Sequence, residues 1–186
     1  MNTYVILIRG INVGGKNIVP MVGLKKCLEE QGFTDVLTYI ASGNVILKSK
    51  KTTGEIKDLL ESTIPANFEL EDGFIKVLVL TCDQFRAVVD RKPEGFGEQP
   101  GKYHSDAIFL MGVDAARAMT VFDPREGVDA IWPGDGVIYS QRLSVQRTRS
   151  RLSKIVGTAV YKSMTIRNWN TVMKLLEILK SRETNA

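Results

Sequence analysis

Cysteine and histidine are scarce in this sequence, which holds two cysteines and one histidine among 186 residues. Cys27 and Cys82 stand far apart, and His104 has no neighbour at the spacing of a metal ligand. Zinc sites combine several such side chains at short, regular spacings, so we expect no metal site. We interpret both thiols as buried structural groups rather than as half of a Cys–His catalytic pair.

Long hydrophobic runs are absent as well. No apolar stretch approaches the roughly 20 residues that cross a bilayer, and the first residues show neither a basic leader nor a cleavage site for secretion. An apolar content of 44% with 25% charged residues is typical of a folded globular chain rather than a disordered one. We therefore expect a cytoplasmic protein without a membrane partner.

Catalytic pairs of acidic residues are lacking too. Acidic side chains gather at residues 69–72 and 123–129, but both stretches lie beside glycine or proline, as in solvated loops. The formal net charge of +4 favours anionic partners, although it is small beside that of typical nucleic-acid-binding domains. We expect no bound cofactor.

The first half of the chain alternates short apolar segments with helical patterns. Residues 3–9 are apolar on both alternating faces, which predicts a strand covered on both sides. Pro20 suits the first turn of a helix, residues 42–44 (SGN) suit a hairpin turn, and a capping box begins at Thr52. We predict strand, helix, strand, strand, helix, strand at residues 3–9, 20–31, 35–41, 45–48, from Thr52 to just before Pro65, and 74–80.

The second half repeats this order after a segment rich in proline and glycine. Asp83 can cap a short helix, residues 92–101 are the expected linker, and Asn168 can cap a final helix. The apolar stripe of that final helix is predicted to be Trp169, Val172, Met173, Leu176 and Leu179. The elements between are strands at residues 106–111, 128–132, 137–140 and 164–166, with helices at 114–122 and around Leu152, Ile155 and Val156.

This order of strands and helices is that of the ferredoxin-like fold. The sequence therefore predicts an α+β protein of two tandem ferredoxin-like (α/β-plait) domains with antiparallel sheets, plus a C-terminal helix. The expected domains are residues 1–81 and 103–186, and residues 82–102 supply the short helix and the linker.

A glycine-rich loop follows the first strand. Residues 10–17 (GINVGGKN) come within one residue of the phosphate-loop pattern, because Asn17 replaces the hydroxyl residue that would hold magnesium. Pro20 also places the helix start several residues late, and an antiparallel sheet is not the setting of a nucleoside triphosphatase. In one interpretation, the loop's backbone N–H groups, with Arg9 and Lys16, hold a phosphate or carboxylate. In the other, the loop is a tight turn whose glycines only satisfy backbone torsions.

Basic residues are densest in the last third of the chain. Serine and threonine interrupt them and could also donate to phosphate oxygens. A solvated surface is one interpretation, and binding of nucleic acid or another polyanion is the other. The aromatic signature of an RNA-recognition sheet is absent. The basic residues are Arg142, Arg147, Arg149, Arg151, Lys154, Lys162 and Arg167.

Three separated motifs carry a family resemblance: residues 9–15 (RGINVGG), 42–45 (SGNV) and 165–171 (TIRNWNT). With them in order over nearly its whole length, the chain resembles the DUF1697 family of small bacterial proteins, where DUF stands for domain of unknown function. The resemblance implies a pair of α/β-plait domains and brings no function with it. It directs attention to the three motifs, including Arg167, where an anion could meet both a guanidinium and a helix N-terminus.

Our leading hypothesis is an anion-binding protein whose ligand is a nucleic acid or a phosphorylated small molecule. One alternative is a small enzyme acting on a phosphorylated or carboxylated metabolite in the cleft between the domains, with Ser42, Asn44, His104 or Thr165 as polar groups. Another is a structural or homodimeric interaction protein without a ligand. The candidate ligand-binding residues are Arg9, Gly10, Asn12, Gly14, Gly15, Lys16, Ser42, Asn44, Arg147, Arg149, Lys154, Thr165, Arg167 and Asn168.

Overall fold

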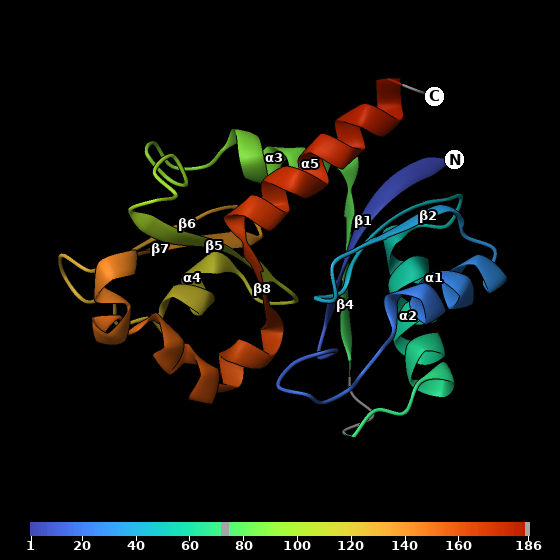
Figure 1. Ribbon diagram of the computed structural model, residues 1–186, viewed down its shortest axis with the longest axis horizontal. Coiled ribbons are helices and arrows are strands. Elements are labelled where there is room, and N and C mark those ends of the chain that lie inside the picture. The colour runs from blue at the N-terminus through green and yellow to red at the C-terminus, as the bar shows by residue number, and fades with distance from the viewer. Residues whose placement is uncertain (72–74, 185–186) are drawn as a thin grey trace. The chain divides into compact units, whose positions relative to one another are not determined.

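The structure is a computed structural model that describes residues 1–71 and 75–184. The chain divides into two compact units, Met1–Phe85 and Arg86–Ala186, called the first and the second unit below. Each unit contains a four-stranded antiparallel sheet with the strand order of a ferredoxin-like fold (Figure 1). The predicted α+β class with two such sheets and a C-terminal helix is confirmed.

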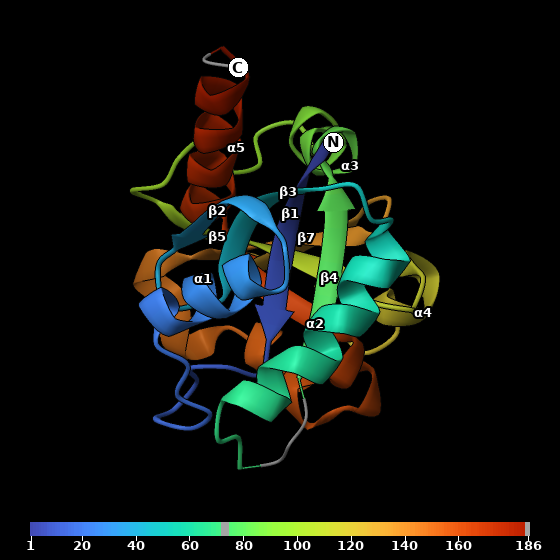
Figure 2. The ribbon, with the colours of Figure 1, turned by 90° about the vertical axis from the view of Figure 1, so that its right-hand side faces the viewer.

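In the first unit, β1 is central because it is the most continuously apolar strand. The strands lie in the order β2-β3-β1-β4, and β1 is buried from Tyr4 to Ile8. Both helices cover one face of this sheet (Figure 2), where they pack Leu24 and Leu60 onto Ile6. The elements are β1 (Asn2–Arg9), α1 (Met21–Glu30), β2 (Thr34–Tyr39), β3 (Asn44–Ser49), α2 (Thr53–Asn67) and β4 (Lys76–Thr81). The expected start of the fourth strand at Phe74 lies outside the described residues.

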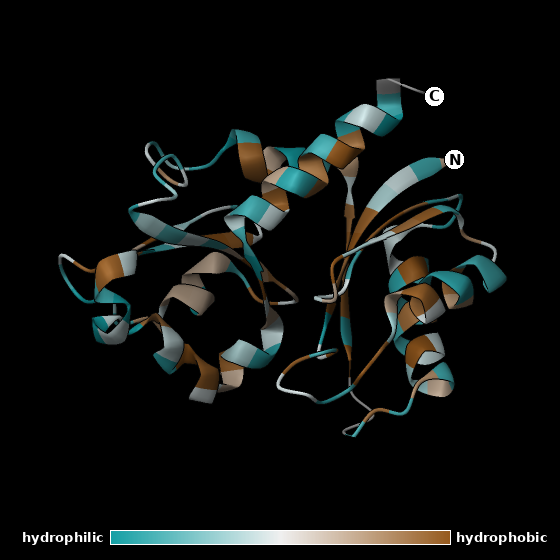
Figure 3. Ribbon diagram, in the orientation of Figure 1, coloured by the Kyte–Doolittle hydropathy of each residue, from teal (hydrophilic) through white to brown (hydrophobic). Residues whose placement is uncertain are grey.

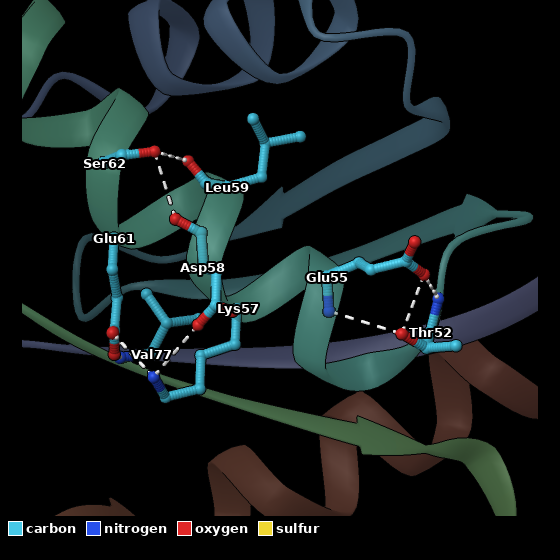
Figure 4. A network of polar contacts seen from close by, with 8 residues as sticks. All are labelled: Thr52, Glu55, Lys57, Asp58, Leu59, Glu61, Ser62 and Val77. Atoms are coloured by element: carbon cyan, nitrogen blue, oxygen red, sulfur yellow. Dashed lines mark hydrogen bonds and ion pairs between the residues drawn. The ribbon is translucent and has the colours of Figure 1, made fainter.

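Helix α2 begins at the predicted capping box but does not end before Pro65, as we had predicted. Thr52 Oγ1 accepts a hydrogen bond from Glu55 N at 3.3 Å, and the Glu55 carboxylate accepts one from Thr52 N at 2.7 Å (Figure 4). Pro65 lies inside the last turn, where Phe68 N still donates to Ile64 O at 3.0 Å. Proline removes one backbone donor, and the burial of Ile64 in the core holds the turn in place.

Helix α2 also protects the edge of the sheet. β4 is an edge strand, and its Val77 N donates to Glu61 Oε1 at 2.8 Å (Figure 4). The other Glu61 oxygen accepts from Lys57 Nζ at 2.7 Å. The carboxylate thus satisfies a donor that an edge strand would otherwise offer to a second sheet.

The second unit repeats the same sheet in the order β6-β7-β5-β8. Helix α3 (Cys82–Asp90) crosses the boundary between the units, and its cap is Thr81 rather than the predicted Asp83, because Thr81 and Gln84 exchange hydrogen bonds of 3.0 and 3.2 Å. The remaining elements are β5 (Tyr103–Leu110), α4 (Ala115–Met119), β6 (Asp129–Pro133), β7 (Val137–Leu143), the 3₁₀ helices η1 (Ser144–Arg149), η2 (Leu152–Gly157) and η3 (Ala159–Ser163), β8 (Met164–Asn168) and α5 (Trp169–Thr184).

Three short 3₁₀ helices stand where a single α-helix around Leu152 was predicted. Hydroxyl side chains in this segment accept hydrogen bonds from backbone N–H groups. Ser150 Oγ accepts from Leu152 N at 3.3 Å, and Thr158 Oγ1 accepts from Tyr161 N at 3.3 Å. Such local bonds compete with a continuous α-helical ladder, so the prediction was wrong here.

The proline- and glycine-rich segment that we expected to be a linker contributes to the core of the second unit. Phe96 is fully buried. Its ring centroid lies 4.9 Å from that of Trp169, 5.1 Å from that of Tyr139 and 6.0 Å from that of Trp132, all in edge-to-face geometry. This cluster holds residues 92–101 against β7 and α5.

Helix α5 buries a slightly different stripe from the predicted one. Trp169, Val172, Leu176 and Leu179 are buried as predicted, but Met173 is 41% exposed and Leu175 takes its place. Figure 3 shows alternating hydrophobic and hydrophilic bands along α5. Residue 173 lies one position past 172, about 100° around the helix, so it turns away from the core. Among the described residues, no helix is long and apolar enough to cross a membrane.

Candidate functional site

The glycine-rich loop of the first unit is a tight hairpin turn. Val13 and Lys16 form an isolated bridge in which Lys16 N donates to Val13 O at 3.0 Å. Gly14 and Gly15 between them have φ values of 59° and 78°. Two consecutive positive φ angles define the turn type that favours glycine at both central positions. The two glycines are therefore explained by the turn itself.

Two asparagines fasten this loop to the body of the unit. Asn12 Nδ2 donates to Val19 O at 3.0 Å and to Ala41 O at 2.9 Å, while its Oδ1 accepts from Val19 N at 2.8 Å. Asn17 Nδ2 donates to Gly10 O at 2.7 Å. Both asparagines have positive φ, which this residue tolerates better than most. The amide groups of both asparagines therefore hold the loop closed.

Lys16, the charged side chain inside the loop, also has a partner. Lys16 Nζ lies 2.8 Å from Glu71 Oε2, in a pair whose side chains are 67% and 55% exposed. Asn17 Oδ1 accepts from Glu71 N at 2.7 Å. Arg9 ends β1 directly opposite Lys76 of β4. The open groove beside the loop is lined by Glu69 and Glu71. Glu71 is paired with Lys16, and the charge of Glu69 opposes the approach of an anion.

The turn between β2 and β3 joins the first two motifs. Asn44 is fully buried and donates to Tyr39 O at 3.1 Å and to Ser42 Oγ at 2.9 Å. Gly43 has a φ of 77°, and a Cβ at this position would lie 2.8 Å from Ile8 O. Only glycine allows the turn to approach β1 this closely. Through the bond from Asn12 to Ala41, the structure brings the RGINVGG and SGN motifs together within the first unit.

The third motif lies in the second unit. Arg167 is buried, and its guanidinium donates to Thr165 Oγ1 at 2.9 Å and to Ile166 O at 2.8 Å. Burial lowers the pKa of Arg167 to about 10, so it remains charged at neutral pH. Asn168 caps α5, since its Oδ1 accepts from Asn170 N at 3.0 Å. Arg167 and Thr165 therefore bond to their own strand.

The basic residues around η1 and η2 fall into two sets. Arg151 donates to Asp123 at 3.0 and 3.1 Å, and Lys154 Nζ lies 3.5 Å from the same carboxylate. Arg147 and Arg149 are exposed on η1, and neither has an acidic partner within residues 1–71 and 75–184. Arg149 Nη1 donates to Gln146 Oε1 at 3.2 Å. Positive charge is therefore in excess at η1.

Asp129 fixes the segment that carries these arginines. Its Oδ2 accepts from Arg151 N at 2.9 Å and from Arg125 N at 3.0 Å. Burial by itself raises the pKa of the Asp129 carboxyl, but these backbone bonds, a bond from Ser150 and the charge of Arg142 outweigh it, so the pKa lies below its ordinary value. The ionised carboxylate is thus the form that holds η1 and η2 on β6.

A small pocket lies where β5 and α5 meet. The pairing of β5 with β8 ends at Asp106 and Asn168, after which the chain turns into α5. The pocket has a volume of about 90 Å³, and its lining is mainly polar. Its side chains include Tyr103, His104, Ser105, Ser144, Trp169 and Asn170.

His104 is oriented by a carboxylate. Its Nε2 lies 3.1 Å from Asp106, two residues along the same strand. Burial raises the pKa of the Asp106 carboxyl, and the nearby positive charges of His104 and Arg142 oppose this. A histidine held by a partly buried carboxylate at the mouth of a pocket is typical of a functional site.

Sequence reasoning named His104 and Asn168 but missed most of this pocket. Residues 104 and 106 share one face of a strand by their spacing, and this signal could have found the pair. Ser105, Ser144 and Asn170 come from three separate elements and meet only through the fold.

A metal site or a reactive thiol finds little support among the described residues. Among the described residues, no group of three or more His, Cys, Asp or Glu side chains is placed to hold a metal ion. Cys27 is buried, and burial, with a smaller contribution from Glu30, raises the pKa of its thiol. A raised pKa disfavours the reactive thiolate.

Comparison with known proteins places the chain in a family. Its fold is similar to that of the conserved bacterial protein SP0830 from Streptococcus pneumoniae, with a TM-score of 0.79 and 24% sequence identity over 96% of this chain and 98% of that chain. At this identity the likeness shows the fold alone. No curated protein matches the chain. The family described as "Protein of unknown function (DUF1697)" matches residues 1–139, and the chain therefore belongs to the DUF1697 family.

Proposed function

We propose that the protein binds the phosphate backbone of a nucleic acid through the exposed basic surface of the second unit. The observation that carries this proposal is the pair Arg147 and Arg149, which are exposed on η1 without an acidic partner in the described part of the chain. Arginine presents several donors in a planar fork that suits phosphate oxygens. Lys154 lies on η2, the next 3₁₀ helix. Lys154 and Arg151 share the carboxylate of Asp123, so these three side chains together carry a net positive charge.

The local backbone supports the same proposal. Exposed hydroxyl groups interleave with the arginines on η1, where Ser144 and Thr148 can donate to phosphate oxygens. Asp129 anchors this segment through Arg125 N and Arg151 N, so the surface is held in place before any ligand arrives. An ordered surface loses less conformational entropy on binding than a mobile one.

The glycine-rich loop of the first unit contributes less to this proposal. Its asparagine amides and Lys16 already have partners within the unit, and two glutamates line the groove beside it. We therefore assign the proposed anion contacts to η1 and η2 rather than to the loop.

Fluorescence anisotropy with labelled single-stranded RNA and DNA tests the proposal. Binding should weaken steeply as salt rises, because each phosphate contact releases counterions. The double variant R147Q/R149Q should weaken binding and lower the slope of log K against log salt by about 1.4, two contacts at about 0.7 each.

The matched control removes two positive charges elsewhere. Lys25 and Lys26 are exposed on α1, each within reach of a glutamate one turn further along the helix. K25Q/K26Q has the same change in net charge and should keep the affinity and slope of the wild type. Equal losses in the two double variants, or binding that does not depend on salt, would contradict the proposal.

A further inference from the structure

We infer that the pocket between β5 and α5 binds a small anion, a molecule that presents a carboxylate or a phosphate group, with protonated His104 as its positively charged partner. This site shares Ser144 with the basic surface described above but uses neither Arg147 nor Arg149, and it does not depend on binding of nucleic acid. The pocket volume of about 90 Å³ is several times what one water molecule needs. It therefore suits one compact charged group rather than a large ligand.

The charges around the pocket favour an anion. No carboxylate is among the side chains that line it, and His104 is its one basic lining residue. Lys102 Nζ lies 5.0 Å from the centroid of the Tyr103 ring, which is part of the lining. Arg142 is the cross-strand partner of His104. Arg142 also faces Asp129 of β6 across the sheet, so the charges of these two side chains offset each other. Lys102 and protonated His104 then stand against the one remaining carboxylate, Asp106, which leaves the surroundings of the pocket net positive.

His104 has one ring nitrogen available for a ligand. Asp106 engages Nε2 at 3.1 Å, and Nδ1 has no hydrogen-bond partner among residues 1–71 and 75–184. A protonated imidazole donates from both nitrogens, so it can hold Asp106 with one and an anion with the other. The side chain is 41% exposed, which lets a small molecule reach it.

The walls of the pocket are already held in place. Gln141 Oε1 accepts from Gly97 N at 3.2 Å and from Ser105 Oγ at 2.9 Å. Asn168 Nδ2 donates to Ser105 O at 3.4 Å, which joins the start of α5 to β5. Binding therefore needs no large rearrangement, a condition that favours affinity for a small ligand.

His104 is the only histidine of the chain, so its imidazole gives unambiguous NMR signals. Inorganic phosphate and acetate are titrated separately into the full-length protein at constant ionic strength with chloride, near pH 6 and near pH 8. We expect saturable shifts of the His104 ring signals at the lower pH and weaker binding at the higher pH. The more effective of the two probes identifies the class of ligand.

Two variants replace polar groups of the pocket lining with apolar ones without changing His104 or Asp106. Asn170 and Ser144 are both exposed and line the pocket from different elements. N170L and S144V should each weaken anion binding by about tenfold, as expected when contacts to a charged ligand are lost. The ring signals of His104 without anion should stay close to those of the wild type, which shows that the fold is intact.

The outcome is separable from that of the nucleic-acid proposal. R147Q/R149Q should keep the response of His104 to the small anion, and N170L should keep the salt-dependent binding of RNA. The inference is overturned if neither phosphate nor acetate gives a saturable shift, or if N170L and S144V respond as the wild type does.

Discussion

The side-chain amide of Asn12 donates to the backbone carbonyl of Ala41 at 2.9 Å, across 29 residues of sequence. This bond fastens the glycine-rich loop to the turn between β2 and β3. Asn12 also bonds to both backbone groups of Val19, at the far end of the loop. Two of the three sequence motifs therefore share one structural role, which is to hold this loop on this turn. These two motifs are therefore explained to a large extent by the way one loop is folded onto one turn.

Replacing Asn12 tests this role. Asn12→Ala removes three hydrogen bonds and puts alanine at a φ of 54°, so we expect a loss of about 2–4 kcal/mol in the free energy of unfolding. Asn12→Gly also removes the bonds but tolerates the backbone angle, and it should lose about 1 kcal/mol less. Urea unfolding followed by far-UV circular dichroism measures both. Two variants as stable as the wild type would show that the bond contributes nothing.

Gly43 and Gly15 form a matched pair for a second prediction. Both have positive φ, 77° and 78°, but only at Gly43 would an added Cβ meet other atoms, with Ile8 O at 2.8 Å. Gly15→Ala should cost about 1 kcal/mol from the backbone angle alone. Gly43→Ala should cost about 1–3 kcal/mol more, because the turn must move away from β1. Equal losses in urea unfolding would contradict the proposed close contact.

The parts of the fold that could be predicted from sequence are those with local signals. The capping box at Thr52 and the apolar alternation of β1 each act within a few residues, so pattern and structure agree. The end of α2 was mispredicted at Pro65 because long-range packing of Ile64 outweighs the local preference. The 3₁₀ helices at residues 144–163 were also mispredicted, although the hydroxyl bonds that compete there with an α-helical ladder act within two or three residues.

The candidate sites were harder to predict for the same physical reason. Lys16 was predicted as an anion ligand from its neighbours in sequence, whereas its partner Glu71 lies 55 residues away. The pocket at His104 depends on Asn170 and Ser144 meeting through the sheet. Sequence can supply the chemical types of such residues, but their convergence is set by the strand order.

The pH dependence of stability should reveal the role of Asp129. Its pKa lies below the ordinary 3.8, so the stability that its ionised form contributes is present above pH 3.8 and is lost as pH falls through the lowered pKa of the folded state. Asp129→Asn should therefore be less stable than the wild type near neutral pH, and the difference should shrink in acid. Tryptophan fluorescence during urea unfolding measures this, because both tryptophans lie in the second unit.

Asp135→Asn is the control for that experiment. The Asp135 side chain is 92% exposed, and its contact with Arg91 is 3.7 Å long. Exposed pairs of this kind contribute little to stability, so this variant should follow the wild type at every pH. A difference between wild type and Asp129→Asn that is constant down to the lowest pH would contradict a role for the ionised carboxylate.

Phe96 tests whether the proline- and glycine-rich segment is part of the core of the second unit. Phe96→Ala empties a fully buried site between three aromatic rings, and the expected loss is about 3–5 kcal/mol. Phe96→Leu keeps most of the side-chain volume and should lose less stability than Phe96→Ala. Because the Phe96 ring contacts those of Trp132 and Trp169, both variants should alter the near-UV circular dichroism and the tryptophan emission. A mobile linker would leave stability and both spectra unchanged, since the packing of its side chains would not matter.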